Sequence, residues 1–244
     1  MATDDFGPAV GRTRLKQAAA DFATRGFVRL ENVLPKRTAQ RLHEWLRDEA
    51  EWWRVLNQGD KVWDLGPESI AALDADPAKA GQLREAINAG ARDGFQFAYD
   101  AVRVADVQAE RKQRQWPVDQ FLDAINSEPW LELFRRVTGN EAIALADGQA
   151  TRYLPEHFLT AHDDDVAGKH RHAAYVLGLT PGWRTHWGGL LMFHAENGDV
   201  EQALMPRFNA MNLFRVPRLH SVSPVAPYAG GARFSVTGWL RGKG

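Results

Sequence analysis

The chain has 244 residues, of which 44% are hydrophobic and 25% are charged, and its formal net charge is −1. This length fits one large domain or a domain with a sizeable extension, and the composition is ordinary for a globular protein. The near-neutral charge, without a block of like charges, gives no electrostatic footprint for a phosphate backbone, so we expect no nucleic-acid partner. Because cysteine is absent, disulfides and thiolate ligands are excluded, and a metal must be bound by histidine and carboxylate side chains.

Two features of the sequence bear on location. The first ten residues, MATDDFGPAV, are acidic and lack an apolar core, which is not the pattern of a signal peptide. No apolar run approaches the ~18 residues that a membrane-spanning helix needs. We therefore expect a soluble cytoplasmic protein without a membrane partner.

Helical periodicity dominates the first 139 residues. Helices are expected at residues 12–25, 35–53, 76–91, 118–125 and 127–139, with a short strand at 27–30. Gly26 and Gly139 stand where the first and last helices end, and Asp76 and Ser127 are suited to cap two helices at their beginnings. Residues 54–65 mix apolar and polar residues around a glycine, which predicts a hairpin or a loop over the functional site.

After Gly139 the pattern changes to short runs rich in β-branched and aromatic residues, separated by Gly and Pro. Many short strands with turn signals between them predict an antiparallel sandwich or barrel. Helices followed by strands predict the α+β class, with the helices packed on one sheet. We expect a single domain over residues 1–244, with a mainly helical part at 1–139 and a β core at 140–244.

The segment 158–165, FLTAHDDD, contains the residues best suited to bind a metal. If it forms the end of a strand, His162 and Asp164 stand two residues apart and leave on the same face. A second histidine from a distant strand would complete a facial two-histidine, one-carboxylate site, which leaves positions open on iron(II). His220, in RLHSVSPV, is placed for that role.

Other residues are rivals for these positions. Asp163 and Asp165 neighbour Asp164, but strand alternation turns them to the face opposite His162. His194, which follows the strand-like run GGLLMF, is a rival third histidine. The remaining candidates, which we expect to be solvated, are His170, His172 and His186.

Arg233 follows His220 by 13 residues, in the strand-like run ARFSVTGWLR. The period of two predicts one face with Arg233, Ser235, Thr237 and Trp239, and another with Phe234, Val236 and Leu240. The planar guanidinium suits the distal carboxylate of an acidic co-substrate, and a buried arginine needs such an anion.

The C-terminal 90 residues resemble the iron(II)- and 2-oxoglutarate-dependent oxygenases, in the prolyl 4-hydroxylase-like branch. The HxD motif, a Trp-spacer-Gly-Gly segment, the distal histidine and the RxSxxGW ending occur in the right order. The run HDDDVAGKHRHAAYVLGLTPGWRTHWGGLLMF is most similar to the prolyl hydroxylases that act on a small-subunit ribosomal protein.

This resemblance implies a double-stranded β-helix core (jelly-roll, cupin-like) and a dioxygenase. Iron(II) would be bound by His162, Asp164 and His220, with 2-oxoglutarate and dioxygen as co-substrates and ascorbate as reductant. 2-Oxoglutarate would be held by Arg233, with Tyr153 and Thr237 nearby. Arg171 and Trp239 are expected to contact the substrate at the mouth of the site.

The substrate implied by the resemblance is a prolyl residue in a protein or peptide, with a ribosomal protein among the candidates. A free amino acid or another small molecule is the first alternative, and a non-catalytic metal-binding β-helix protein is the second. The chain also departs from the family. Gly178 stands before Leu179-Thr180, where prolyl hydroxylases often have a tyrosine, so a contact to the co-substrate is lost there or is supplied from elsewhere.

Overall fold

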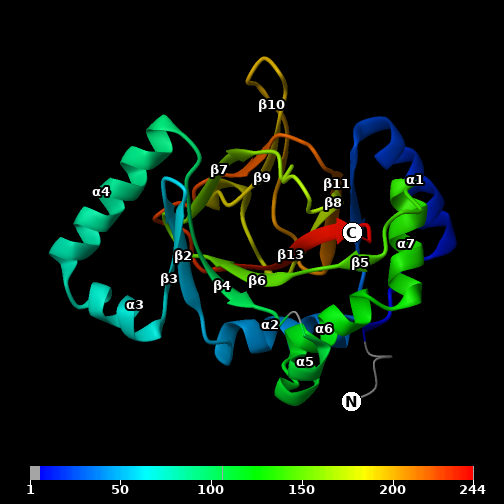
Figure 1. The fold of residues 1–244 in the computed structure, drawn as a ribbon, viewed down its shortest axis with the longest axis horizontal. Helices are drawn as coiled ribbons and strands as arrows, with labels where there is room; N and C mark the ends of the chain where they lie inside the picture. Colours follow the sequence, from blue (N-terminus) through cyan, green and yellow to red (C-terminus); the bar gives the residue numbers. More distant parts are fainter. Residues whose placement is uncertain (1–5, 106, 244) are drawn as a thin grey trace.

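The core of the fold is an antiparallel jelly roll. The computed structural model describes residues 6–105 and 107–243. One layer has the order β11-β8-β13-β6 and the other the order β7-β12-β9-β10 (Figure 1). The strands are β6 (Gln149–Tyr153), β7 (Phe158–His162), β8 (Arg171–Gly178), β9 (Leu191–His194), β10 (Val200–Leu204), β11 (Ala210–Arg215), β12 (His220–Val222) and β13 (Arg233–Arg241). All pairings between described strands are antiparallel, and two four-stranded layers in this order form a jelly roll, so the predicted fold class is confirmed.

The first half of the chain adds strands to this core. They are β1 (Phe27–Glu31), β2 (Trp53–Gln58), β3 (Lys61–Leu65) and β4 (Phe97–Arg103), and the later β5 (Leu145–Ala146) pairs with β13. β1 extends the sheet beyond β11, and β4 pairs with both β6 and β7, so that it joins the two layers. β2 and β3 form the predicted hairpin, which is attached to β4. In the described residues, strands from both halves of the chain thus belong to one sheet.

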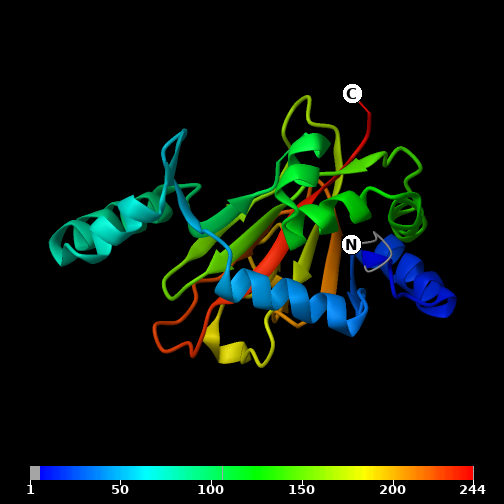
Figure 2. The ribbon, with the colours of Figure 1, turned by 90° about the horizontal axis from the view of Figure 1, so that it is seen from below.

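Four helices cover the outer face of the β11-β8-β13-β6 layer, as predicted. They are α1 (Arg12–Arg25), α2 (Lys36–Asp48), α6 (Pro117–Ile125) and α7 (Glu128–Thr138), and α5 (Gln108–Arg114) packs beside α6. Their buried side chains form one core cluster with Phe234, Val236 and Leu240 of β13. Figure 2 shows α2 lying along this face of the sheet. None of the described helices combines the length and apolar character that crossing a lipid bilayer requires.

Helices α3 (Pro67–Asp74) and α4 (Pro77–Asp93) are arranged differently. They project from the side of the sheet as a wing, and neither contains a buried residue (Figure 1). The side chain of Asp76 accepts a hydrogen bond from the backbone N–H of Lys79 at 3.1 Å, which is the cap that the sequence predicts. A cavity of about 760 Å³ separates α4 from the outer face of β7 and β12.

Two local predictions are wrong, and two strands were not predicted. The helix expected at 35–53 ends at Asp48, because the tryptophan pair read as a helical stripe belongs to extended chain, with Trp52 buried in the core and Trp53 exposed at the start of β2. Strands β4 and β10 were not expected; β10 is an edge strand with little apolar alternation. Ser127 does precede α7, but its side chain makes no capping hydrogen bond.

Candidate metal centre

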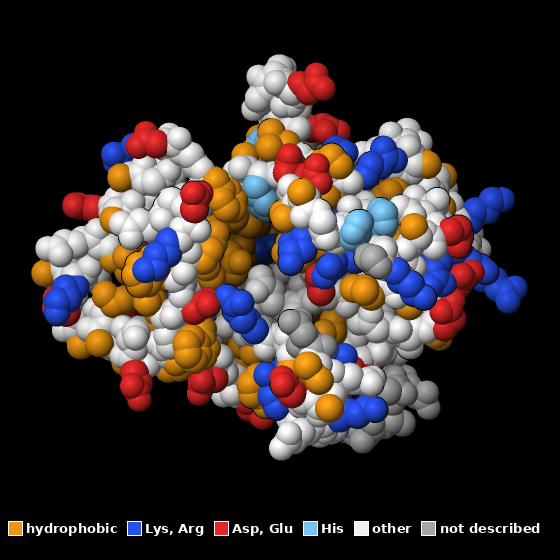
Figure 3. Space-filling view, viewed as in Figure 1, with side chains coloured by type: hydrophobic (Ala, Val, Ile, Leu, Met, Phe, Trp, Pro, Cys, Tyr) orange, Lys and Arg blue, Asp and Glu red, His pale blue; other side chains and the backbone are white. Residues whose placement is uncertain are grey.

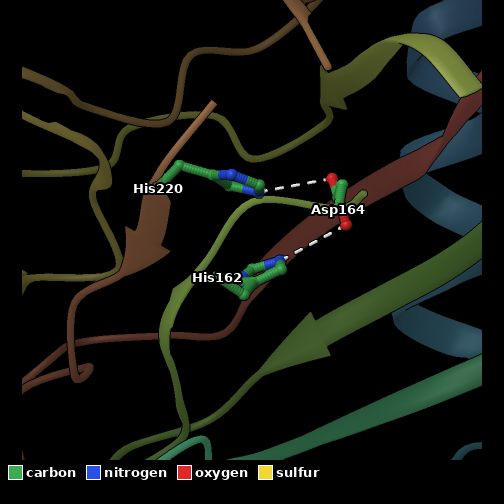
Figure 4. Close-up of side chains that lie close together, drawn as sticks. All are labelled: His162, Asp164 and His220. Carbon is green, nitrogen blue, oxygen red and sulfur yellow. Dashed lines mark ion pairs between the residues drawn. The ribbon is translucent and has the colours of Figure 1, made fainter. Parts of the chain in front are cut away.

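Two histidines and an aspartate converge at the open end of the jelly roll. His162 is the last residue of β7 and His220 the first of β12, and the register sets them opposite each other, with ring centroids 4.1 Å apart. The Nε2 atom of each imidazole lies 3.5 Å from a different carboxylate oxygen of Asp164 (Figure 4). Potential ligand atoms of the three residues all lie within 4.8 Å of one another. This is the grouping of residues that the sequence predicts.

The reason for the grouping differs from the prediction. Asp164 lies beyond the end of β7, and its backbone is left-handed, with φ at +65°. Aspartate tolerates this conformation better than most residues, since its short polar side chain bonds locally. The guanidinium Nη1 of Arg171 donates a hydrogen bond to the Asp164 carbonyl at 3.0 Å, which holds the turn. The carboxylate therefore reaches the histidines through a turn rather than through strand alternation.

Backbone carbonyls orient both imidazoles. His162 Nδ1 donates to the Thr160 carbonyl at 3.0 Å, and His220 Nδ1 donates to the Arg218 carbonyl at 2.8 Å. A proton on Nδ1 leaves the lone pair of Nε2 free, and such a fixed tautomer is typical of metal-ligating histidines. Burial lowers the pKa of His220 to about 4, so its imidazole is neutral at pH 7.

The carboxylate of Asp164 complements the two imidazoles. Burial by itself would raise the pKa of Asp164, but His162 and His220, when they are protonated, outweigh that effect and lower it. One anionic oxygen ligand and two neutral nitrogen ligands on one side of a site form the donor set of non-haem iron(II) enzymes. The residues present therefore fit iron(II).

The rival residues lie outside this group. Asp163 and Asp165 are exposed, and the side chain of Asp163 accepts a hydrogen bond from the backbone N–H of Asp165. His194 Nε2 is bonded to the Ser221 hydroxyl at 2.7 Å, beside the large cavity under α4. Among the described residues, the cluster able to hold a metal consists of His162, Asp164 and His220 alone.

The three residues face a cavity of about 190 Å³ between the two layers, and Arg233 lines the same cavity. Arg233 is only 3% exposed, and its Nε has no hydrogen-bond partner. Its guanidinium lies 4.8 Å from the ring centroid of Tyr153, and no ion pair within the described chain includes it. Burial lowers the pKa of Arg233, while Tyr153 opposes that shift. A buried cation without an anionic partner is costly, so this side fits the carboxylate of a small dianion such as 2-oxoglutarate.

The remaining predicted residues lie around the same cavity. Tyr153 and Thr237 line it together with Trp239, and the alternation predicted for β13 is correct, since Phe234 and Val236 belong to the core cluster on its other face. The guanidinium of Arg171 stacks 3.6 Å above the ring of Trp239. Arg171 thus sits beside both Trp239 and Asp164.

The backbone at Gly178, where the chain departs from the family, leaves no room for a side chain. A Cβ at this position would lie 2.3 Å from the carbonyl oxygen of Arg207, so a larger residue does not fit the backbone here. The ring of Tyr99, on β4, lines the same cavity and stacks on Tyr153 with ring centroids 5.3 Å apart. The sequence analysis missed this residue, although Phe95, Phe97 and Tyr99 alternate with period two.

The comparisons with known proteins agree with this geometry. Residues 148–241 match the sequence model of the 2OG-Fe(II) oxygenase superfamily. No curated protein sequence matches the chain. A prolyl-4-hydroxylase from Pseudomonas putida has a similar structure, with a TM-score of 0.58, 21% identity, and coverage of 94% of this chain and 99% of that one.

Two other solved structures are similar in the same way. One is a prolyl hydroxylase from Trichoplax adhaerens in complex with a peptide fragment of a hypoxia-inducible factor, with a TM-score of 0.53, 16% identity, and coverage of 96% and 94%. The other is an oxidoreductase of the 2OG-Fe(II) oxygenase family from Burkholderia pseudomallei, with a TM-score of 0.54, 14% identity, and coverage of 97% and 94%. The resemblance to iron(II)- and 2-oxoglutarate-dependent oxygenases with prolyl 4-hydroxylase-like relatives is therefore confirmed.

Proposed function

We propose that this protein is an iron(II)- and 2-oxoglutarate-dependent dioxygenase that hydroxylates an unactivated C–H bond of a prolyl residue in a protein or peptide. One observation carries the proposal above all. His162, Asp164 and His220 face the same small cavity as a buried arginine, Arg233, that lacks an anionic partner. A metal-ligand set next to an unpaired buried cation supports a metal enzyme with an anionic co-substrate.

Each residue has a role in this proposal. His162 and His220 would hold iron(II) through Nε2 and Asp164 would hold it through its carboxylate, and a set of only three protein ligands would leave room for a co-substrate. Iron(II), together with 2-oxoglutarate and dioxygen, supplies the oxidation that inserts one oxygen atom into a C–H bond while 2-oxoglutarate becomes succinate and carbon dioxide. Arg233 holds the distal carboxylate of the co-substrate, with Tyr153 and Thr237 beside it. Ascorbate serves as reductant.

The size of the cavity favours a polypeptide substrate. A volume of about 190 Å³ lies below the ~300–1,000 Å³ that is usual for pockets enclosing a whole small molecule. With 2-oxoglutarate inside, little room remains, so a substrate must present one side chain from outside. Arg171 and Trp239 lie next to Asp164 and are suited to contact the substrate chain. A ribosomal protein is the first candidate, because the run around the metal ligands resembles prolyl hydroxylases of that kind.

The test is succinate formation by the purified protein with iron(II), 2-oxoglutarate, ascorbate and air. It is run alone, with ribosomal-protein peptides, with other proline-containing peptides and with free L-proline. We expect stimulation by a peptide together with a product heavier by one oxygen atom. Stimulation by free L-proline alone would instead identify a small-molecule hydroxylase. Metal binding without turnover under any of these conditions would favour a non-catalytic protein.

A further inference from the structure

A row of aromatic rings forms one wall of the cavity. Phe95 and Phe97 have ring centroids 5.6 Å apart, and Phe97 and Tyr99 follow at 5.5 Å. Tyr99 stacks on Tyr153, whose ring in turn faces Arg233. At the other end, the ring of Phe95 lies 5.5 Å from that of His162. The row therefore runs from a proposed metal ligand to the proposed co-substrate residue.

The row also runs from solvent to the interior. Phe95 is 50% exposed, Phe97 is 9% exposed, and Tyr153 is 3% exposed. A single exposed phenylalanine is common on protein surfaces and says little by itself. Here the exposed ring is the outermost member of a continuous apolar wall that lines the cavity. In the face shown in Figure 3, hydrophobic side chains gather at the hollow between the wing and the body of the molecule.

Hydrogen bonds hold the backbone directly after Phe95. Asn57 Nδ2 donates to the Phe95 carbonyl at 2.9 Å, and the backbone N–H of Gln96 donates to the Thr160 hydroxyl at 2.8 Å. The Thr160 N–H returns a hydrogen bond to the Gln96 carbonyl at 2.9 Å. Gln96 is 3% exposed, and its amide donates to the backbone carbonyl of Asn57. Because Thr160 is two residues before His162, this network fixes the exposed ring relative to the proposed metal ligand.

The charges of the cavity limit what it can accept. Apart from the proposed metal ligands, Arg233 is the one charged residue among the described residues that line it. If Arg233 binds the co-substrate, no counter-ion for a charged side chain remains among the residues that line the cavity, and burying an unpaired charge is costly. Aromatic surfaces, in contrast, suit apolar side chains and are the usual lining of grooves that bind proline-containing segments.

We propose that Phe95 and Phe97 form the wall that selects an apolar target side chain against a charged one. The target residue packs on the Phe95 ring as it enters and on Phe97 once it faces the metal centre. This inference rests on the proposed function, since it names the residues that select the substrate of that same site. It extends the function by naming two residues outside the motif-bearing segment.

The first experiment measures binding, without catalysis. Four short peptides of one host sequence carry proline, leucine, lysine or glutamate at one position. They are titrated calorimetrically into the protein loaded with manganese(II) and 2-oxoglutarate in the absence of oxygen. We expect the proline and leucine peptides to bind at least about tenfold more tightly than the charged ones. Equal binding of all four peptides, or no binding by any, would overturn the proposal whether or not the protein turns over 2-oxoglutarate.

The second experiment compares variants. Phe95→Ala is expected to weaken binding of the proline peptide about tenfold and Phe95→Leu by less, with 2-oxoglutarate affinity unchanged. Phe95→Glu is expected to shift the preference toward the lysine peptide. Val200→Ala is the matched control, because Val200 is also 50% exposed but lies on β10, outside the cavity. Unchanged binding of the proline peptide by Phe95→Ala would contradict the role assigned to Phe95. Phe97→Leu applies the same test to Phe97, the next ring toward the interior.

Loss of the proposed function has a different signature. If the wild-type protein binds the apolar peptides selectively but forms no succinate in air with iron(II), the role of Phe95 and Phe97 is supported and the proposed dioxygenase activity is contradicted. If succinate forms and the four peptides stimulate its formation equally, the dioxygenase activity is supported and the selective role of Phe95 and Phe97 is contradicted.

Discussion

The two layers of the jelly roll differ in what covers them. The β11-β8-β13-β6 layer is covered by packed helices, and its outward side chains share a large core with them. The β7-β12-β9-β10 layer bears His162 and His220, and on its outer face a cavity of about 760 Å³ lies between α4 and the strands. Apolar packing thus covers the outer face of the first layer, while the second layer holds the proposed histidine ligands and has little packing on its outer face.

The difference explains where the parts of the site lie. Arg233, proposed to hold the co-substrate, is on the helix-covered layer, and the two histidines are on the other. The cavity between the layers is the place where both sets of residues meet. We therefore expect the covered layer to supply most of the stability, and we expect removal of the proposed ligands to leave that stability largely intact.

The largest expected effect is the loss of activity when a proposed metal ligand is removed while the fold is retained. His162→Ala, Asp164→Ala and His220→Ala are each expected to reduce iron-dependent succinate formation to the background rate. The reason is that each removes one of three proposed ligands. Unfolding by urea is expected to remain cooperative in all three variants. The rivals Asp163→Ala and His194→Ala are the controls and should retain turnover. Full activity in a ligand variant would show that the ligand is misassigned.

The next effect concerns the covered layer. Phe234 packs from β13 against Trp52 and His43, so Phe234→Ala is expected to lower the free energy of unfolding by about 3–5 kcal/mol. Ile87→Ala, on the wing, is the comparison. Because α4 has no buried residue, we expect a loss below about 1 kcal/mol there. Both losses in the free energy of unfolding are measured from the urea concentration at the midpoint of unfolding. Similar losses in the two variants would mean that the wing belongs to the core.

Sequence and structure agree best where the information is local. The strand that contains Arg233 could be predicted from its period-two alternation, and the two histidines could be predicted from short motifs. Both signals are properties of residues that are adjacent in the sequence. The turn at Asp164 could not, since a left-handed residue held by Arg171 depends on a contact with another strand. The position of β4 between β6 and β7 is likewise a long-range pairing. The alternation of Phe95, Phe97 and Tyr99 was nevertheless visible in the sequence, and it was overlooked.

A smaller effect is expected in the pH dependence of stability, and it arises from His157, beside the large cavity. Burial lowers the pKa of His157 to about 4, whereas an exposed histidine in the unfolded chain titrates near ~6.5. The unfolded state therefore gains its proton first as the pH falls. The contribution of His157 to stability is complete above pH ~6.5 and is lost as the pH falls toward about 4, by up to about 3 kcal/mol.

His157→Asn isolates this contribution. Nδ1 of His157 accepts a hydrogen bond from the Leu154 N–H at 3.2 Å, and the asparagine oxygen offers a similar acceptor that does not titrate. The difference in unfolding free energy between wild type and variant is expected to change between pH 7 and pH 4 in favour of the variant. A difference that is constant over this range would show that His157 has an ordinary pKa in the folded protein.

The smallest effect returns to the contrast between the layers. Arg233 is fixed on the well-packed layer, so Arg233→Met should preserve the fold and raise the 2-oxoglutarate requirement by about 10–100-fold, the usual cost of losing a charge-assisted hydrogen bond. Without co-substrate, the variant should melt no lower than the wild type, because it removes an unpaired buried charge. Added 2-oxoglutarate should then raise the melting temperature of the wild type but scarcely that of the variant. Equal stabilisation of both proteins would mean that Arg233 is structural and that another group binds the co-substrate.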